Sequence, residues 1–415
     1  MNYTRRNFLK ATLGSSAMLS LTPAAPNFMV RSMMAATHRR NKRDTVLVVV
    51  QLSGGNDGLN TIVPYEDDEY ARNRPTLRLS SNEIHKINSR LGFHPRMGAF
   101  KNLYEQGHLS IIQGVGYPYS DRSHETAMRI WHTATPEKPD CQTGWLGRTV
   151  DSIWESNNIN TPAVFVGKIA RPFGLNAKSV IVPAINSLGN LTINEMPAYQ
   201  SQQQRAAALT HDDQNNSFLH YLQKCTLNAH TNSRRIEAVM NKIADTAEYP
   251  SFELAGSLRM VAQLIRADIG IRIFFTELGG GGIGGFDNHA NQLGNHCALL
   301  HHLSESIAAF IHDLKRDKLL NRVLLMTFSE FGRTVKENGR RGTGHGAAAP
   351  IFLAGGKLKD GLIGSHPSLT DLDDGALKFN TDFRSVYATI LDRWLGFDSS
   401  KVLDKQYESL NILGV

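Results

Sequence analysis

The sequence predicts an α/β protein, a layered domain whose central sheet is mostly parallel. Six short apolar runs, rich in β-branched residues, have the length of buried strands: residues 45–52, 109–115, 163–167, 271–278, 323–328 and 350–354. Apolar residues also recur at helical spacing around residues 97–106 and 296–314. Strands that alternate with helices are typical of this fold class, in which ligands bind beyond the carboxyl ends of the strands.

The first run, residues 45–52, is almost continuous Val and Leu, as expected of a strand buried on both faces. Residues 109–115 repeat the pattern after the helix expected at 97–106. The stretch 296–314 places Leu299, Leu303 and Ile307 on one helical face. Residues 186–250 are mostly polar, with apolar residues at helical intervals, and predict a helical insertion or cap over the sheet.

Composition places the chain among ordinary globular proteins, because 41% of its 415 residues are hydrophobic and 20% are charged. Collagen-like, coiled-coil and wholly disordered structures are thereby excluded. The formal charge is +7, but residues 1–36 contribute four basic residues and no acid, and a further basic run lies at 38–43. Charge concentrated beside a terminal segment is weak support for nucleic-acid binding, so we expect no nucleic-acid partner.

The N-terminus carries a pattern typical of twin-arginine export. Arg5 and Arg6 are followed by Phe-Leu-Lys and by a short, weakly apolar stretch. We expect residues 1–36 to be the signal, recognised by the twin-arginine translocase, and the protein to act in the periplasm or elsewhere outside the cytoplasm. Cleavage near Ala35-Ala36, an uncleaved anchor and an ordinary amphipathic helix all remain open.

Beyond the signal we expect a single domain, residues 45–415. No later segment reaches the ~18 apolar residues of a membrane helix. The three cysteines, Cys141, Cys225 and Cys297, are too few and too widely spaced for a disulfide framework or a zinc CxxC site.

Polar residues follow the expected strands. Asp57 comes after the first strand in a Gly-rich turn, where turn formation alone could explain it. Arg122, Ser123 and His124 follow the second, directly before a helix-forming run. Ser123 is either an N-cap or a nucleophile at a helix N-terminus, and Arg122 and His124 could contact an anionic substrate.

Asp287 and His289 follow the strand at 271–278 and suit a divalent cation. The intervening Gly-rich stretch, residues 279–285, matches a dinucleotide-binding pattern only trivially. We reject that motif, because a helix occupies the place where the acidic ribose partner would lie.

Glu330 and Arg333 follow the strand at 323–328, and His345 stands between glycines before the last strand. We interpret Glu330 as a ligand, because burial of an unpaired carboxylate is costly, and Arg333 as an anion clamp; a Glu330–Arg333 ion pair is the alternative. Five strand-end loops with carboxylates, imidazoles and a hydroxyl predict a metal-assisted site for a phosphate or sulfate ester.

These motifs resemble the DUF1501 family of twin-arginine-exported proteins of unknown function and, more loosely, the alkaline phosphatase/sulfatase superfamily. The resemblance rests on the segments 51–60, 122–124, 286–292, 328–334 and 342–346. It implies an alkaline-phosphatase-like, three-layer sandwich. A formylglycine-type sulfatase is not expected, because Ser123 lacks the Cys-x-Pro-x-Arg context.

The resemblance also implies roles for individual residues. Asp57 looks like the first-strand metal ligand and Ser123 like the nucleophile, while one metal is held by Asp287, His289 and His345. Glu330 stands where the superfamily has an Asp-His pair. Phe331 replaces that histidine and cannot bind a metal, so a second metal site is short of a ligand. Gly344 stands where this family often has a carboxylate.

We therefore expect an exported hydrolase that uses a divalent metal ion (zinc, or calcium, magnesium or manganese) and acts on a small-molecule or glycan ester. The alternative is a non-catalytic envelope protein of the same fold that binds a polyanionic glycan or a partner protein. A cofactor-bearing oxidoreductase ranks last, because the chain shows no cofactor motif.

Overall fold

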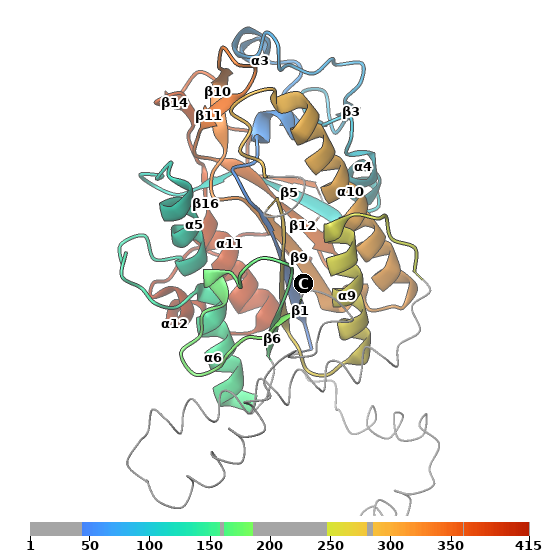
Figure 1. Cartoon of the computed structure of the whole chain (residues 1–415), viewed down its shortest axis with the longest axis vertical. Helices are drawn as coiled ribbons and strands as arrows, with labels where there is room; N and C mark the ends of the chain where they lie inside the picture. The colour runs from blue at the N-terminus through green and yellow to red at the C-terminus, as the bar shows by residue number, and fades with distance from the viewer. Residues whose placement is uncertain (1–43, 158–161, 186–246, 280–284, 360, 415) are drawn as a thin grey trace, which may run out of the picture. The chain divides into compact units, whose positions relative to one another are not determined.

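A nine-stranded sheet forms the centre of the folded unit Thr45–Val415 in the computed structural model (Figure 1). The structure describes residues 44–157, 162–185, 247–279, 285–359 and 361–414. The strands lie in the order β13-β5-β12-β9-β1-β8-β6-β7, and β16 also pairs with β5. Their bounds are β1 Val46–Leu52, β5 Leu109–Gly116, β6 Ala163–Val166, β7 Ala184–Ile185, β8 Ile273–Leu278, β9 Val323–Phe328, β12 Ala349–Gly355, β13 Gly361–Ile363 and β16 Thr381–Asp382.

The sheet is mostly parallel, as predicted. β1 pairs in parallel with β8 and β9, and the pairings of β6 with β7 and β8 and of β5 with β13 and β16 are also parallel. β12 alone among the described strands of this sheet runs antiparallel to its neighbours, β5 and β9. The carboxyl end of β12 therefore lies at the edge opposite to the carboxyl ends of the parallel strands.

Helices cover both faces of the sheet and make a three-layer sandwich, which confirms the predicted fold class (Figure 1). All seven residues of β1 are buried, and its alternate side chains enter two separate hydrophobic clusters. One cluster contains side chains of α4 Gly98–Glu105, α9 Glu253–Ala267 and α10 Gln292–Arg316. The other contains side chains of α5 His124–Thr133, α6 Trp145–Asn157, α11 Phe383–Thr389, the π-helical turn η4 Ile390–Leu395 and α12 Ser399–Leu403.

Two small sheets lie outside the central one. One has the order β11-β10-β15-β14 and consists of β10 Arg333–Glu337, β11 Thr343–His345, β14 Leu372–Asp373 and β15 Ala376–Leu377. The other has the order β2-β4-β3 and consists of β2 Ile62–Val63, β3 His85–Lys86 and β4 Gly92–Phe93. The remaining short helices are η1 Gly58–Asn60, α3 Asp68–Asn73, η2 Phe173–Leu175 and η3 Leu320–Arg322.

The predicted elements have nearly the expected bounds. All six expected strands are present, and β9 has the predicted ends. α10 is longer at both ends than the predicted 296–314. The expected signal at 1–36, Cys225 and most of the expected insertion at 186–250 lie outside the described residues. Within the described part of the chain, no helix is both long and apolar enough to cross a membrane.

Candidate metal centre

Side chains from four separate segments of the chain meet beyond the carboxyl ends of the parallel strands. Asp287 and His289 lie in the connection from β8 to α10, and His345 is the last residue of β11. His124 is the first residue of α5, and Glu330 follows β9. The topology brings these segments together because β8, β9 and β5 all end at the same edge of the sheet.

Three potential ligand atoms form a close triangle. The Asp287 Oδ1 atom lies 2.9 Å from His289 Nε2 and 3.2 Å from His345 Nε2, and the two Nε2 atoms are 2.9 Å apart. Ligand atoms around a tetrahedral zinc ion are about 3.3 Å apart, which follows from bonds of ~2 Å. His124, Asp287 and His345 also form a group whose ligand atoms all lie within 4.8 Å of one another. These side chains fit a divalent cation.

The ring of His345 is oriented as in many metal-binding histidines. Its Nδ1 atom lies 2.7 Å from the carbonyl oxygen of Arg122, to which it donates a hydrogen bond, so Nε2 presents its lone pair to the triangle. Phe331 stacks against this ring at 4.6 Å and contacts the ring of His124 at 4.9 Å. Phe331 therefore supplies apolar packing beside the imidazoles.

Glu330 holds His124 in place. The Oε1 atom of Glu330 lies 2.9 Å from His124 Nδ1 and also accepts from the Gly54 backbone N–H, while Oε2 accepts from the Ser329 hydroxyl. Both oxygens of this buried carboxylate thus have hydrogen-bond partners. The other ring nitrogen of His124 lies 3.4 Å from Asp287 Oδ2. The hydrogen bond that His124 donates to Glu330 raises the pKa of His124 above its usual value.

Arg333 is buried and joins the loops of the site. Its guanidinium donates to the carbonyl oxygens of Gly54, Gly55 and Phe286 and to Asp287 Oδ1. Although burial favours the neutral acid, the hydrogen bond and charge of Arg333 lower the pKa of Asp287 overall. Arg333 was expected to clamp a substrate anion or to pair with Glu330; here it is paired with Asp287 and 2% exposed.

Ser123 lies beside the cluster, between two residues that take part in it. The carbonyl of Arg122 binds His345, and His124 binds Glu330. Ser123 occupies the N-cap position of α5, but its exposed hydroxyl makes no capping hydrogen bond among the described residues. The guanidinium of Arg122, expected to contact substrate, binds the carbonyls of residues 373 and 374 and the Asp374 carboxylate.

Asp57 lies in a different, buried network. Its two oxygens accept hydrogen bonds from Arg74 at 2.6 and 3.1 Å, and Oδ2 also accepts from Gln292. These contacts favour a structural role for Asp57, whereas its expected role as a metal ligand stays a prediction. Burial raises the pKa of Asp57, but the charge and hydrogen bonds of Arg74 outweigh burial and bring it to about 2.

The sequence did not identify Arg74, Gln292 and Thr343, whose hydrogen bonds hold the loops of the site together. Arg74 also donates to the carbonyls of Thr334 and Val335, and Thr343 donates its hydroxyl to Gln292. These bonds tie Asp57 to the β10–β11 hairpin that carries His345. Gln292 follows His289 by three positions, and this short spacing is the one signal in the sequence that could have identified it.

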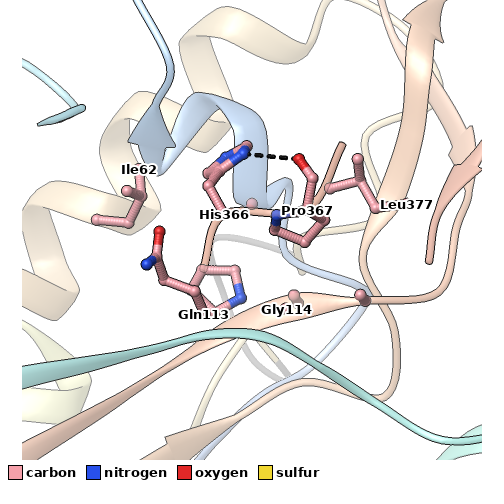
Figure 2. Close-up of a pocket in the computed structure, with 10 residues that line it drawn as sticks. Ile62, Gln113, Gly114, His366, Pro367 and Leu377 are labelled. Carbon is pink, nitrogen blue, oxygen red and sulfur yellow. Dashed lines mark hydrogen bonds between the residues drawn. The ribbon is translucent and has the colours of Figure 1, made fainter. Parts of the chain in front are cut away.

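A small cavity lies elsewhere, beside β5 and β12 (Figure 2). Its volume is about 20 Å³, enough for one water molecule, and Gln113 and His366 are among its lining residues. The buried Gln113 Oε1 atom has no hydrogen-bond partner within the described structure, whereas Nε2 donates to the Gly364 carbonyl. The cavity shares no lining residue with the candidate metal centre.

Comparisons with solved structures find distant similarities. The chain aligns with PsFucS1 sulfatase from Pseudoalteromonas sp. at 9% identity and a TM-score of 0.39, covering 92% of this chain and 73% of that one. A protein in the alkaline phosphatase superfamily from Vibrio parahaemolyticus aligns at 9% identity and a TM-score of 0.38, with coverages of 88% and 69%. The C-terminal periplasmic domain of EcEptC from Escherichia coli aligns at 11% identity and a TM-score of 0.37, with coverages of 87% and 86%.

A search of curated proteins finds no match. A protein family does match, and over most of the chain: residues 44–408 fit the family described as "Protein of unknown function (DUF1501)". The match includes every residue of the candidate metal centre. Because it covers most of the chain, the chain belongs to the DUF1501 family.

Proposed function

We propose that this chain is an exported, metal-dependent hydrolase of phosphate or sulfate esters. The observation that carries the proposal is the triangle of Asp287 Oδ1, His289 Nε2 and His345 Nε2, with sides of 2.9–3.2 Å. Two imidazoles and a carboxylate suit zinc best among the divalent ions considered, since calcium and magnesium prefer oxygen ligands. When bound, such an ion would polarise an ester oxygen and stabilise developing negative charge.

Ser123 is the nucleophile in this proposal. Its hydroxyl is exposed and free of a capping bond, and its chain neighbours on both sides contact the cluster. His124 is the group that handles protons: Glu330 binds its Nδ1, which leaves Nε2 to accept or return a proton at the reacting oxygen. Buried Arg333 positions Asp287 for binding.

Metal content tests the proposal most directly. The full chain is exported from its own host, purified without a chelating column and subjected to elemental analysis. We expect about one equivalent of a divalent metal in the wild type, and its loss in Asp287→Asn, His289→Ala and His345→Ala. His312→Ala, which alters an exposed histidine of α10, is the matched control and should keep the metal. Retention of the metal in all three site variants would contradict the proposed centre.

Activity tests the chemistry. Nitrophenyl phosphate, bis(nitrophenyl) phosphate and nitrophenyl sulfate report the three ester classes. We expect Ser123→Ala to abolish turnover while the metal content stays at the wild-type level. Full activity of this variant would refute its role as the nucleophile.

Export is proposed from Arg5 and Arg6. The double change Arg5→Lys/Arg6→Lys should leave the folded protein in the cytoplasm, as cell fractionation would show. A wild-type distribution of the variant would contradict the twin-arginine route.

One observation favours the second candidate, a non-catalytic envelope protein that binds a polyanionic glycan or a partner protein. Phe331 packs on His345 and His124 with a ring that cannot bind a metal. This function predicts no turnover on any of the three esters, together with saturable ligand binding that survives a chelator.

A further inference from the structure

The two arginines expected to bind the substrate anion are already engaged. Arg333 binds the carbonyls of the neighbouring loops and Asp287, and Arg122 binds Asp374. A substrate with an anionic group besides the reacting ester would need cationic partners other than these two arginines and the proposed metal ion. Two exposed arginines lie in the turn that joins β10 to β11, and this turn contacts the chain just after the loop that carries Asp287 and His289.

That turn contains Arg340 and Arg341 and is fastened to the start of α10. The carbonyl of Arg340 accepts from the backbone N–H of Asn291 at 3.0 Å, and that of Arg341 accepts from Gln292 at 2.9 Å. Asn338 also donates its side-chain amide to the carbonyl of His289 at 3.0 Å. The backbone of the turn therefore lies directly against the segment that carries His289.

The side chains of Arg340 and Arg341 are exposed, and neither has a carboxylate partner in the part of the chain that the structure describes. Many other basic side chains do have one, for example Arg72, Lys101 and Arg122. Arg341 also has a φ of +58°, in the left-handed region that non-glycine residues rarely adopt. Strain of this kind is often found at functional sites.

We propose that Arg340 and Arg341 form an anion-binding rim beside the candidate metal centre, and that the substrate carries at least one anionic group besides the reacting ester. The substrate class would thus be a polyanion, such as a multiply sulfated or phosphorylated glycan. This inference rests on the proposed function for its link to catalysis, but anion binding at the rim can be measured independently.

Two lysines at the opposite edge of the sheet provide a matched control. Lys357 and Lys359 are exposed and follow the carboxyl end of β12. Because β12 is antiparallel to β9, this end lies beside the start of β9, where Gly355 pairs with Leu324. A change at these lysines removes the same charge far from the rim.

The experiment measures binding of dextran sulfate, a polyanion that chelates metals weakly, to the full metal-loaded protein by calorimetry at two salt concentrations. Neutral dextran is the negative probe. The rim variant is Arg340→Gln/Arg341→Asn, because asparagine tolerates the left-handed conformation. Arg340→Lys retains charge, and Lys357→Gln/Lys359→Gln is the control.

We expect the rim variant to lose about tenfold in affinity, equivalent to about 1.4 kcal/mol, with a weaker salt dependence. The lysine control should stay within twofold of the wild type, as should the metal content of every variant. An unchanged affinity of the rim variant, or an equal loss of affinity in the lysine control, would contradict the proposal that Arg340 and Arg341 bind the anion. A protein that binds dextran sulfate through the rim but contains no metal would instead refute the proposed hydrolase.

Discussion

The buried pair of Asp57 and Arg74 allows a quantitative test of whether Asp57 supports the fold or binds a metal. The carboxylate and guanidinium are joined by two hydrogen bonds, and both side chains are at most 3% exposed. Asp57→Asn would leave the Arg74 charge buried without its counter-charge. Removal of one partner of such a pair costs about 3–5 kcal/mol in free energy of unfolding.

The pKa of Asp57 gives a second, lower value for the free energy that this pair contributes to folding. It is lowered from 3.8 to about 2. At about 1.4 kcal/mol per pH unit, this corresponds to roughly 2–3 kcal/mol. Because the folded-state pKa is below the unfolded one, this stabilisation is complete above pH 3.8 and is lost as the pH falls towards 2. The difference in stability between wild type and Asp57→Asn should therefore shrink over the same range.

Urea unfolding at pH 7 and at pH 3 measures both effects. Asp371→Asn, which alters an exposed carboxylate paired with Lys378, is the control and should change stability by less than about 0.5 kcal/mol. The double variant Asp57→Asn/Arg74→Met should recover part of the loss. If Asp57→Asn loses its metal but unfolds within 1 kcal/mol of the wild type, the structural role is refuted and the predicted ligand role stands.

Three further outcomes are expected. Burial raises the pKa of Glu277 to about 7, above its ordinary 4.5, so folding stability should fall as the pH rises from about 4.5 to 7; urea unfolding of Glu277→Gln should show a smaller decrease. Gly342→Ala should weaken metal binding, which elemental analysis would measure, because a Cβ there would lie 2.2 Å from the backbone carbonyl carbon of His289. Gly294→Ala in α10 is the control: its Cβ meets no atom within 4 Å, and thermal unfolding should show a helix stabilised by roughly 0.5–1 kcal/mol. Glu330→Gln should lower the pKa of His124, which NMR titration of the imidazole would measure; an unchanged value would show that the hydrogen bond is not its cause.

The central sheet could be predicted because each of its longer strands is a run of apolar residues buried on both faces. β1, β5 and β9 have this character over most of their length. The two small sheets have strands of two to five residues, too short for periodicity to reveal.

The site could be predicted in part, since strand ends place Asp287, His289 and His345 at one edge. Their residue types indicate a cation, although their roles remain predictions. Arg74 could not be predicted to pair with Asp57, because it caps a mostly polar short helix that in sequence is typical of a solvated surface. The sequence places the charged side chain of Arg333 near the site. It does not reveal whether the N–H groups of Arg333 bind a substrate or backbone carbonyls.

The contacts of Arg333 have a consequence for protein engineering. One planar group connects three loops that are remote in sequence, so a change at this position would shift all of them together. Lysine, with a single nitrogen, could replace only a fraction of those connections. Attempts to redirect specificity are therefore better aimed at the exposed side chains of Arg340 and Arg341, which can be changed while the backbone hydrogen bonds of their turn are kept.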